Sequence, residues 1–114
     1  MKTWTAQTIL ETLAAHRDTL YRLGARKLGL FGSYARGEQT PDSDMDFVVV
    51  LARPRFYDYM DIKLFLEDLF GRKVDLAIED GLREAFRAQI LKEVMYVEGL
   101  QDTIERRAAI HPEN

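Results

Sequence analysis

Three aspartates are the residues of this sequence whose type and spacing most clearly suggest chemistry. Asp44 and Asp46 stand two residues apart at the start of an apolar, β-branched stretch. In a strand, residues i and i+2 project from the same face, so these two carboxylates would lie side by side. Carboxylates that close repel each other unless cations lie between them, and all-oxygen ligands suit Mg²⁺ or Mn²⁺ better than zinc.

Asp75 is the third acidic candidate, because it interrupts a second short apolar stretch, where an unpaired charge is costly to bury. If its strand lies beside the strand that follows Asp44 and Asp46, three acids converge on one point. That is the electrostatic arrangement of a two-metal phosphoryl-transfer site. The alternative is that Asp75 forms an ordinary ion pair with Arg72 or Lys73.

Gly32 and Ser33 follow the first predicted strand and are candidates to hold phosphate groups. A glycine allows a close backbone approach, and a helix beginning at the serine would present amides and a hydroxyl to an anion. Arg36 could add positive charge to the same phosphates, or pair with Glu38 or Asp42 on an exposed helix. The residues that follow are not those of a P-loop.

The hydrophobic periodicity predicts the elements that position these side chains. Helices are expected at 5–23 and 57–70, with glycines as stops, and a further helix is expected to begin at Asp80, with a buried stripe of Leu82, Phe86, Ile90 and Val94. Strands are expected at 27–31, 44–51, 73–78 and 95–97. This order predicts an α/β (α+β) fold, a small mixed β-sheet with helices packed on it.

Gly32-Ser33, ten intervening residues, Asp44-x-Asp46 and a later Asp75 together resemble the polymerase-β-type nucleotidyltransferase superfamily. The fuller string GSYARGEQTPDSDMDFVVV is similar to its minimal nucleotidyltransferase branch, the antitoxin partners of HEPN-domain toxins. The resemblance covers residues 24–98. It implies the polymerase β-like fold, with a catalytic core at about 24–98 of a single domain 1–114 and a polar tail at 100–114.

The resemblance also implies a reaction, in which AMP passes from ATP to a hydroxyl, expected to be a tyrosine of a HEPN toxin, with release of pyrophosphate. Two Mg²⁺ ions, or Mn²⁺, would be held by three catalytic acids, which are Asp44, Asp46 and Asp75. ATP phosphates would contact the nucleotide-binding candidates, which are Gly32, Ser33, Arg36 and Ser43.

Two other functions stay open. One is neutralisation of a partner by binding alone, and the other is a small-molecule nucleotidyltransferase completed by homodimerisation. With 114 residues, we expect no second domain to grip an acceptor, so a protein partner would supply its own surface. An apolar group after the central strand is a candidate docking patch, although at least half of it would instead close the core: Phe56, Tyr57, Tyr59 and Met60.

Composition excludes several classes of protein. The net charge of −3 and scattered basic residues argue against direct nucleic-acid binding, and the absence of cysteine excludes disulfides and thiolate chemistry. The longest apolar run, 47–52, is far shorter than the roughly 18 residues of a membrane span. We therefore expect a cytoplasmic protein, in which His16 and His111 are surface residues and not catalysts.

Overall fold

The computed structural model describes residues 3–100, which fold around one four-stranded sheet. The elements follow one another along the chain as α1 (Ala6–Ala15), α2 (Arg17–Leu23), β1 (Ala25–Phe31), α3 (Gly32–Arg36), β2 (Met45–Leu51), α4 (Phe56–Phe70), β3 (Val74–Ile78), the 3₁₀ helix η1 (Glu79–Gly81), α5 (Glu84–Glu93) and β4 (Met95–Tyr96).

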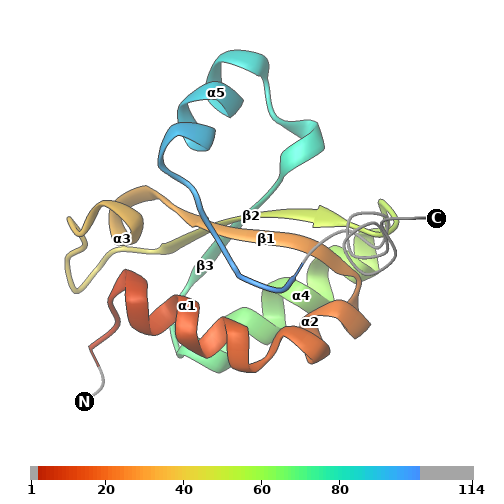
Figure 1. Cartoon of the computed structure of the whole chain (residues 1–114), viewed down its shortest axis with the longest axis horizontal. Helices are drawn as coiled ribbons and strands as arrows, with labels where there is room; N and C mark the ends of the chain where they lie inside the picture. Colours follow the sequence, from red (N-terminus) through yellow and green to blue (C-terminus); the bar gives the residue numbers. More distant parts are fainter. Residues whose placement is uncertain (1–2, 101–114) are drawn as a thin grey trace, which may run out of the picture.

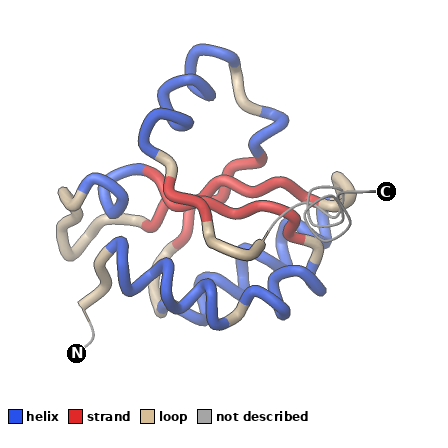
Figure 2. The backbone as a smooth tube through the Cα atoms, in the orientation of Figure 1, coloured by secondary structure: helices blue, strands red, loops and turns tan. Residues whose placement is uncertain are grey.

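The sheet is mixed, as the sequence predicts, with the strand order β3-β2-β1-β4. β2 pairs in parallel with β3, through the crossover helix α4, and antiparallel with β1, which in turn pairs antiparallel with β4. The apolar segment of β2 is therefore a central strand. Figures 1 and 2 show α1, α2 and α4 against one face of the sheet, α5 on the other face, and α3 at one end of β1.

The face that carries α1, α2 and α4 holds the apolar core. Alternate strand residues point into it, and helix residues at spacings of three and four meet them. Trp4 closes one end, with its indole N–H donating to the Phe70 carbonyl at 3.0 Å. The fully buried side chains of this core include Ile9, Leu13, Leu20, Leu28, Leu30, Met45, Phe47, Val49, Ile62 and Leu66.

The first predicted helix is in fact two helices. α1 ends at Ala15 because His16 leaves the helical conformation, with φ −112°, and its N–H donates to the Leu13 carbonyl three residues back. The predicted stop near Gly24 is confirmed: this residue ends α2 with φ 110°, in the left-handed region that favours glycine. His16 also lies half-buried, with its ring 5.9 Å from that of Phe65.

The helix expected to begin at Asp80 was placed wrongly. Asp80 lies in η1, and α5 begins only at Glu84. The expected buried stripe fails too, because Ile90 is buried but Phe86 is 52% exposed. Ile90 is the only buried residue of α5, whose other side chains are partly or fully exposed, so the helix has a narrower buried face than its apolar spacing predicts.

Strands β1, β2, β3 and β4, helix α4 and its glycine stop at Gly71 lie within two residues of their predicted positions. The polar tail, including His111, lies outside the described residues from 101 onwards. Between residues 3 and 100, none of the helices is both long and apolar enough to cross a lipid bilayer.

Candidate active site

Asp46 and Asp75 lie opposite each other on neighbouring parallel strands. The register of β2 and β3 pairs these two residues directly, between the core pairs Met45–Val74 and Phe47–Leu76. Because the flanking residues point into the core, the two aspartates point to the opposite face, the one that carries α5. The adjacency predicted from the sequence is therefore present.

The Asp46 carboxylate lies in an acidic environment. Burial, followed by the charges of Asp75 and Asp44, raises its pKa to about 6, while Arg36 acts in the opposite direction. Asp44 stands just before β2 and is exposed, as is Asp75. Within residues 3–100 neither carboxylate forms an ion pair or hydrogen bond, so the alternative pairing of Asp75 with Arg72 or Lys73 is not observed there.

Gly32 brings the turn after β1 against the same carboxylate. It has φ 77°, and a Cβ at this position would overlap the Asp46 side chain. Phe31, the residue before it, pairs with Asp46 across the β1–β2 ladder. Glycine is therefore required here for two reasons, the left-handed backbone and the close approach. The glycine turn and the acidic strand, predicted from separate motifs, lie at one place.

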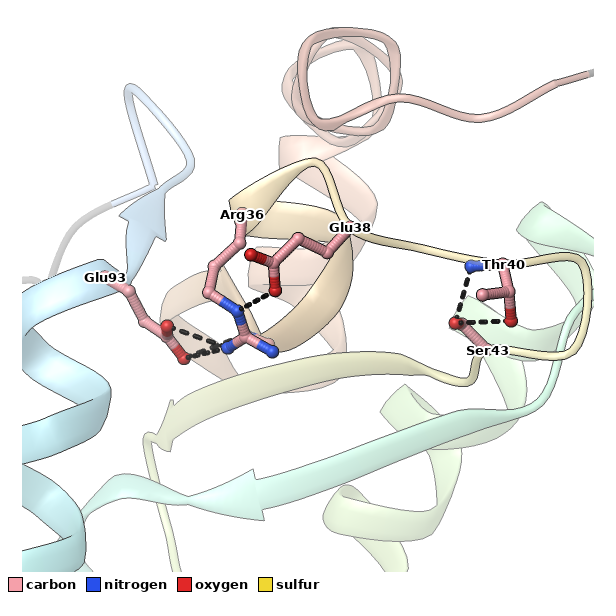
Figure 3. A network of polar contacts seen from close by, with 6 residues as sticks. Arg36, Glu38, Thr40, Ser43 and Glu93 are labelled. Carbon is pink, nitrogen blue, oxygen red and sulfur yellow. Dashed lines mark hydrogen bonds and ion pairs between the residues drawn. The ribbon is translucent and has the colours of Figure 1, made fainter.

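Arg36 and Ser33 belong to the short helix α3 that follows this glycine. The Arg36 guanidinium pairs with Glu38 through Nε at 2.9 Å and with Glu93 through Nη1 at 2.9 Å, as Figure 3 shows. Pairing with Glu38 is thus one of the two roles expected for Arg36, and its contact with phosphate stays a prediction. Ser33 is half-buried, and its carbonyl accepts from the Glu38 N–H at 2.9 Å.

Ser43 has a structural task in the loop before β2. Its hydroxyl accepts from the Thr40 N–H at 2.8 Å and lies 3.2 Å from the Thr40 hydroxyl, at the right of Figure 3. Its carbonyl accepts from Arg72 at 3.0 Å. These contacts stabilise the loop that precedes Asp44. Nucleotide binding by Ser43 stays a prediction.

The three carboxylates suit a divalent cation in their chemistry, and Asp44 and Asp75 lie near enough to Asp46 for their charges to raise its pKa. Across residues 3–100, however, no three acidic or histidine side chains are gathered tightly enough to hold one ion among them. Asp44 and Asp75 are exposed, so their side chains have room to change rotamer toward Asp46.

Glu93, at the end of α5, is a site residue that the sequence did not reveal. Its Oε1 accepts from the Gly32 N–H at 3.1 Å, and both of its carboxylate oxygens lie within 3.2 Å of Arg36 Nη1. Nothing in the local sequence distinguishes it from any exposed helix glutamate. Only the placement of α5 over the sheet brings it to the glycine turn.

A second polar contact anchors the same side of the sheet. Glu79, in η1, is almost fully buried and accepts from the Tyr96 hydroxyl at 2.8 Å, with Arg87 at 3.7 Å. Burial and this hydrogen bond raise the pKa of Tyr96 to about 12. The contact ties the segment before α5 to β4, which follows it, and so holds α5 in place.

Comparison with known proteins agrees with this geometry. The family described as nucleotidyltransferase domain matches residues 12–97, most of the chain. Protein adenylyltransferase MntA of Thermococcus cleftensis is 38% identical over 95 residues, covering 82% of this chain and 96% of that protein. A Methanocaldococcus jannaschii protein, named as a candidate protein adenylyltransferase, is 35% identical and covers 82% and 98%. The chain belongs to the nucleotidyltransferase-domain family and is an enzyme of that class.

Solved structures give the same result for the fold. One described as a candidate minimal nucleotidyltransferase is 42% identical, with a TM-score of 0.62 over 75% of this chain and 93% of that one. A chain in the complex of the tri-AMPylated HEPN toxin of Shewanella oneidensis with MNT antitoxin is 16% identical to this one. Its TM-score is 0.51, over 87% of this chain and 80% of that one. The fold of this chain is that of the minimal nucleotidyltransferases.

Proposed function

We propose that this protein is an antitoxin that transfers AMP from ATP, with Mg²⁺, to a tyrosine hydroxyl of a HEPN-type partner. The observation that carries the proposal is the pairing of Asp46 with Asp75 on one sheet face, directly beside the Gly32 turn. Membership of the nucleotidyltransferase family and the adenylyltransferase relative from Thermococcus cleftensis support the same reaction.

The metal site of this proposal consists of Asp44, Asp46 and Asp75. A bound divalent ion, Mg²⁺ or Mn²⁺, would neutralise the charge that develops on the phosphates. The raised pKa of Asp46 supports a cation at this place, because a positive charge would remove the repulsion among the three carboxylates. Two ions are the expected number.

The nucleotide would lie along the turn that follows β1. The Gly32 N–H and the Ser33 hydroxyl would donate to phosphate oxygens, and Arg36 would add positive charge. Ser43, in the loop that precedes Asp44, would be a further contact to the nucleotide. These residues would hold the triphosphate beside the acceptor hydroxyl, so that positioning and charge neutralisation would supply most of the rate enhancement.

Asp75 would serve the acceptor side. It lies on β3, the edge strand of the sheet, and it is exposed, so an incoming hydroxyl can reach it. As the acceptor oxygen bonds to the α-phosphorus and the bond to pyrophosphate breaks, Asp75 accepts the hydroxyl proton. The products are an AMP-modified tyrosine and pyrophosphate.

An apolar surface beside β3 is suited to a protein partner. Phe56 and Tyr57, at the start of α4, are 69% and 78% exposed, whereas Tyr59 packs on the core and donates to the Leu76 carbonyl at 2.7 Å. Next to them is a cavity of about 350 Å³ lined by Pro54, Arg55, Phe56, Tyr59 and Ile78. Of the four residues predicted as a docking patch, Phe56 and Tyr57 are therefore exposed, Tyr59 packs on the core and Met60 is partly buried.

Co-expression with the neighbouring reading frame, followed by intact-mass measurement of the protein that it encodes, tests the proposal. We expect the partner to gain AMP with the wild-type chain and not with Asp46→Asn. Asp68→Asn is the matched control, because Asp68 is an exposed acid on α4, on the opposite side of the sheet. A different result would support antitoxin action by binding alone. In that case the partner stays unmodified, and both the wild type and the double variant Asp44→Asn/Asp46→Asn still neutralise it.

A further inference from the structure

The Gly32 amide and the Arg36 guanidinium already hold an anion, and that anion is the Glu93 carboxylate. Glu93 Oε1 accepts from the Gly32 N–H at 3.1 Å and from Arg36 Nη1 at 3.2 Å, while Oε2 lies 2.9 Å from the same Nη1. Figure 3 shows the carboxylate of α5 facing the guanidinium of α3. A backbone amide and a guanidinium converging on paired oxygens is also how proteins bind phosphate.

Other forces do not favour this position for Glu93. It is the last residue of α5, where the negative end of the helix dipole disfavours a carboxylate. The charges of Glu93 and Asp46 also repel each other. The contacts with Gly32 and Arg36 are therefore the interactions that keep the Glu93 side chain at this turn.

We infer that Glu93 competes with the nucleotide phosphates for Gly32 and Arg36, and so sets the affinity of the chain for ATP. The inference rests on the proposed function, which assigns these two donors to phosphate. One amide and one guanidinium edge hold one anion at a time, so ATP binding requires the Glu93 carboxylate to turn away. Its side chain is partly exposed, 24% accessible, and therefore has solvent to turn into.

The competition is specific to phosphate, and this makes it measurable. Glu93→Gln keeps the length of the side chain and an oxygen for the Gly32 N–H, but removes the charge that repels phosphate and pairs with Arg36. We expect this variant to bind ATP about tenfold more tightly, the effect of roughly one charged hydrogen bond. Adenosine, which has no phosphate, should bind both forms alike.

Calorimetric titration of the full chain with Mg²⁺-ATP and with adenosine is the test, and ATP in EDTA shows whether the effect depends on the metal. Glu84→Gln, at the exposed opposite end of α5, is the matched control and should bind ATP as the wild type does. Glu93→Ala repeats the test if Glu93→Gln melts at a lower temperature. Tighter binding of ATP alone by the Glu93 variants supports the inference.

Two other results are distinguishable. If the wild type binds ATP and the Glu93 variants bind it equally or more weakly, Glu93 supports the nucleotide instead of competing with it, and the inference fails while the proposed function stands. If neither the wild type nor the variants bind ATP, with or without Mg²⁺, both the inference and the proposed function are overturned.

Discussion

The two faces of the sheet differ in almost every physical respect. On one face, alternate residues of β1, β2 and β3 pack against α1, α2 and α4 in a continuous apolar core. On the other, the same strands carry Asp46 and Asp75, and α5 contributes only one fully buried side chain, Ile90. One face supplies the free energy of folding, and the other positions charged groups at the cost of some stability. Neighbouring residues of one strand can therefore have opposite effects on stability.

The largest effect is expected on the apolar face. Phe47 is fully buried and stacks on Phe70, with ring centroids 5.9 Å apart. Phe47→Ala should lower the free energy of unfolding by about 3–5 kcal/mol, because it removes apolar contact and leaves a cavity. Urea unfolding measures this loss. A loss below about 1 kcal/mol would mean that this face is not the main source of stability.

A pair of glycine variants separates backbone strain from the close approach at the site. Gly32 and Gly37 both have positive φ, 77° and 73°, but only at Gly32 would a Cβ meet the Asp46 side chain. Gly37→Ala should cost about 1 kcal/mol, for strain alone. Gly32→Ala should cost about 2 kcal/mol or more and abolish AMP transfer, because the carboxylate is displaced.

Thermal melting and the partner's intact mass provide the two measurements for this pair. If both variants lost the same stability and both kept full transfer, the contact between Gly32 and Asp46 would have no functional role.

The hydrogen bond from Tyr96 to buried Glu79 should contribute less to the free energy of unfolding than a core side chain, but more than an ordinary hydrogen bond. Tyr96→Phe leaves buried Glu79 without its 2.8 Å donor, and we expect a loss of about 2 kcal/mol. Tyr59→Phe is the control, since that hydroxyl donates to a neutral carbonyl, and should cost about 1 kcal/mol. Urea unfolding compares the two. Equal losses of stability in the two variants would argue against a stronger, charge-assisted hydrogen bond at Glu79.

The smallest expected effect has the opposite sign. The folded state raises the pKa of Asp46 to about 6, above its ordinary value of 3.8, so its stabilising contribution is present below that value and is lost as pH rises through 6. Asp46→Asn should therefore stabilise the chain by about 1 kcal/mol at pH 7.5 and by almost nothing at pH 4. The effect at pH 7.5 is no larger because solvent screens this half-exposed group.

Melting temperatures across this pH range check the expectation, with Asp68→Asn as a control that should show no such dependence. A destabilised Asp46→Asn at pH 7.5 would show that the carboxylate is held by favourable contacts and not strained by its neighbours.

Much of the apolar face was predictable, because alternation in strands and three-four spacing in helices depend on local sequence alone. Asp46 and Asp75 could also be placed together, since a strand–helix–strand unit brings parallel strands side by side. The break at His16 and the late start of α5 were missed, because weak local signals decide them. The Glu93–Gly32 contact spans 61 residues and depends on how α5 sits on the sheet, so no local pattern contains it.

The most direct test is a crystal structure of the chain with Mg²⁺ and a non-hydrolysable ATP analogue. We expect the ion between the carboxylates of Asp44 and Asp46 and within reach of Asp75, phosphate oxygens at Gly32 and Ser33, and the Glu93 carboxylate moved from the Gly32 amide. An analogue bound elsewhere on the chain, or bound at this turn with no ion touching any of the three aspartates, would contradict the assignment of the active site.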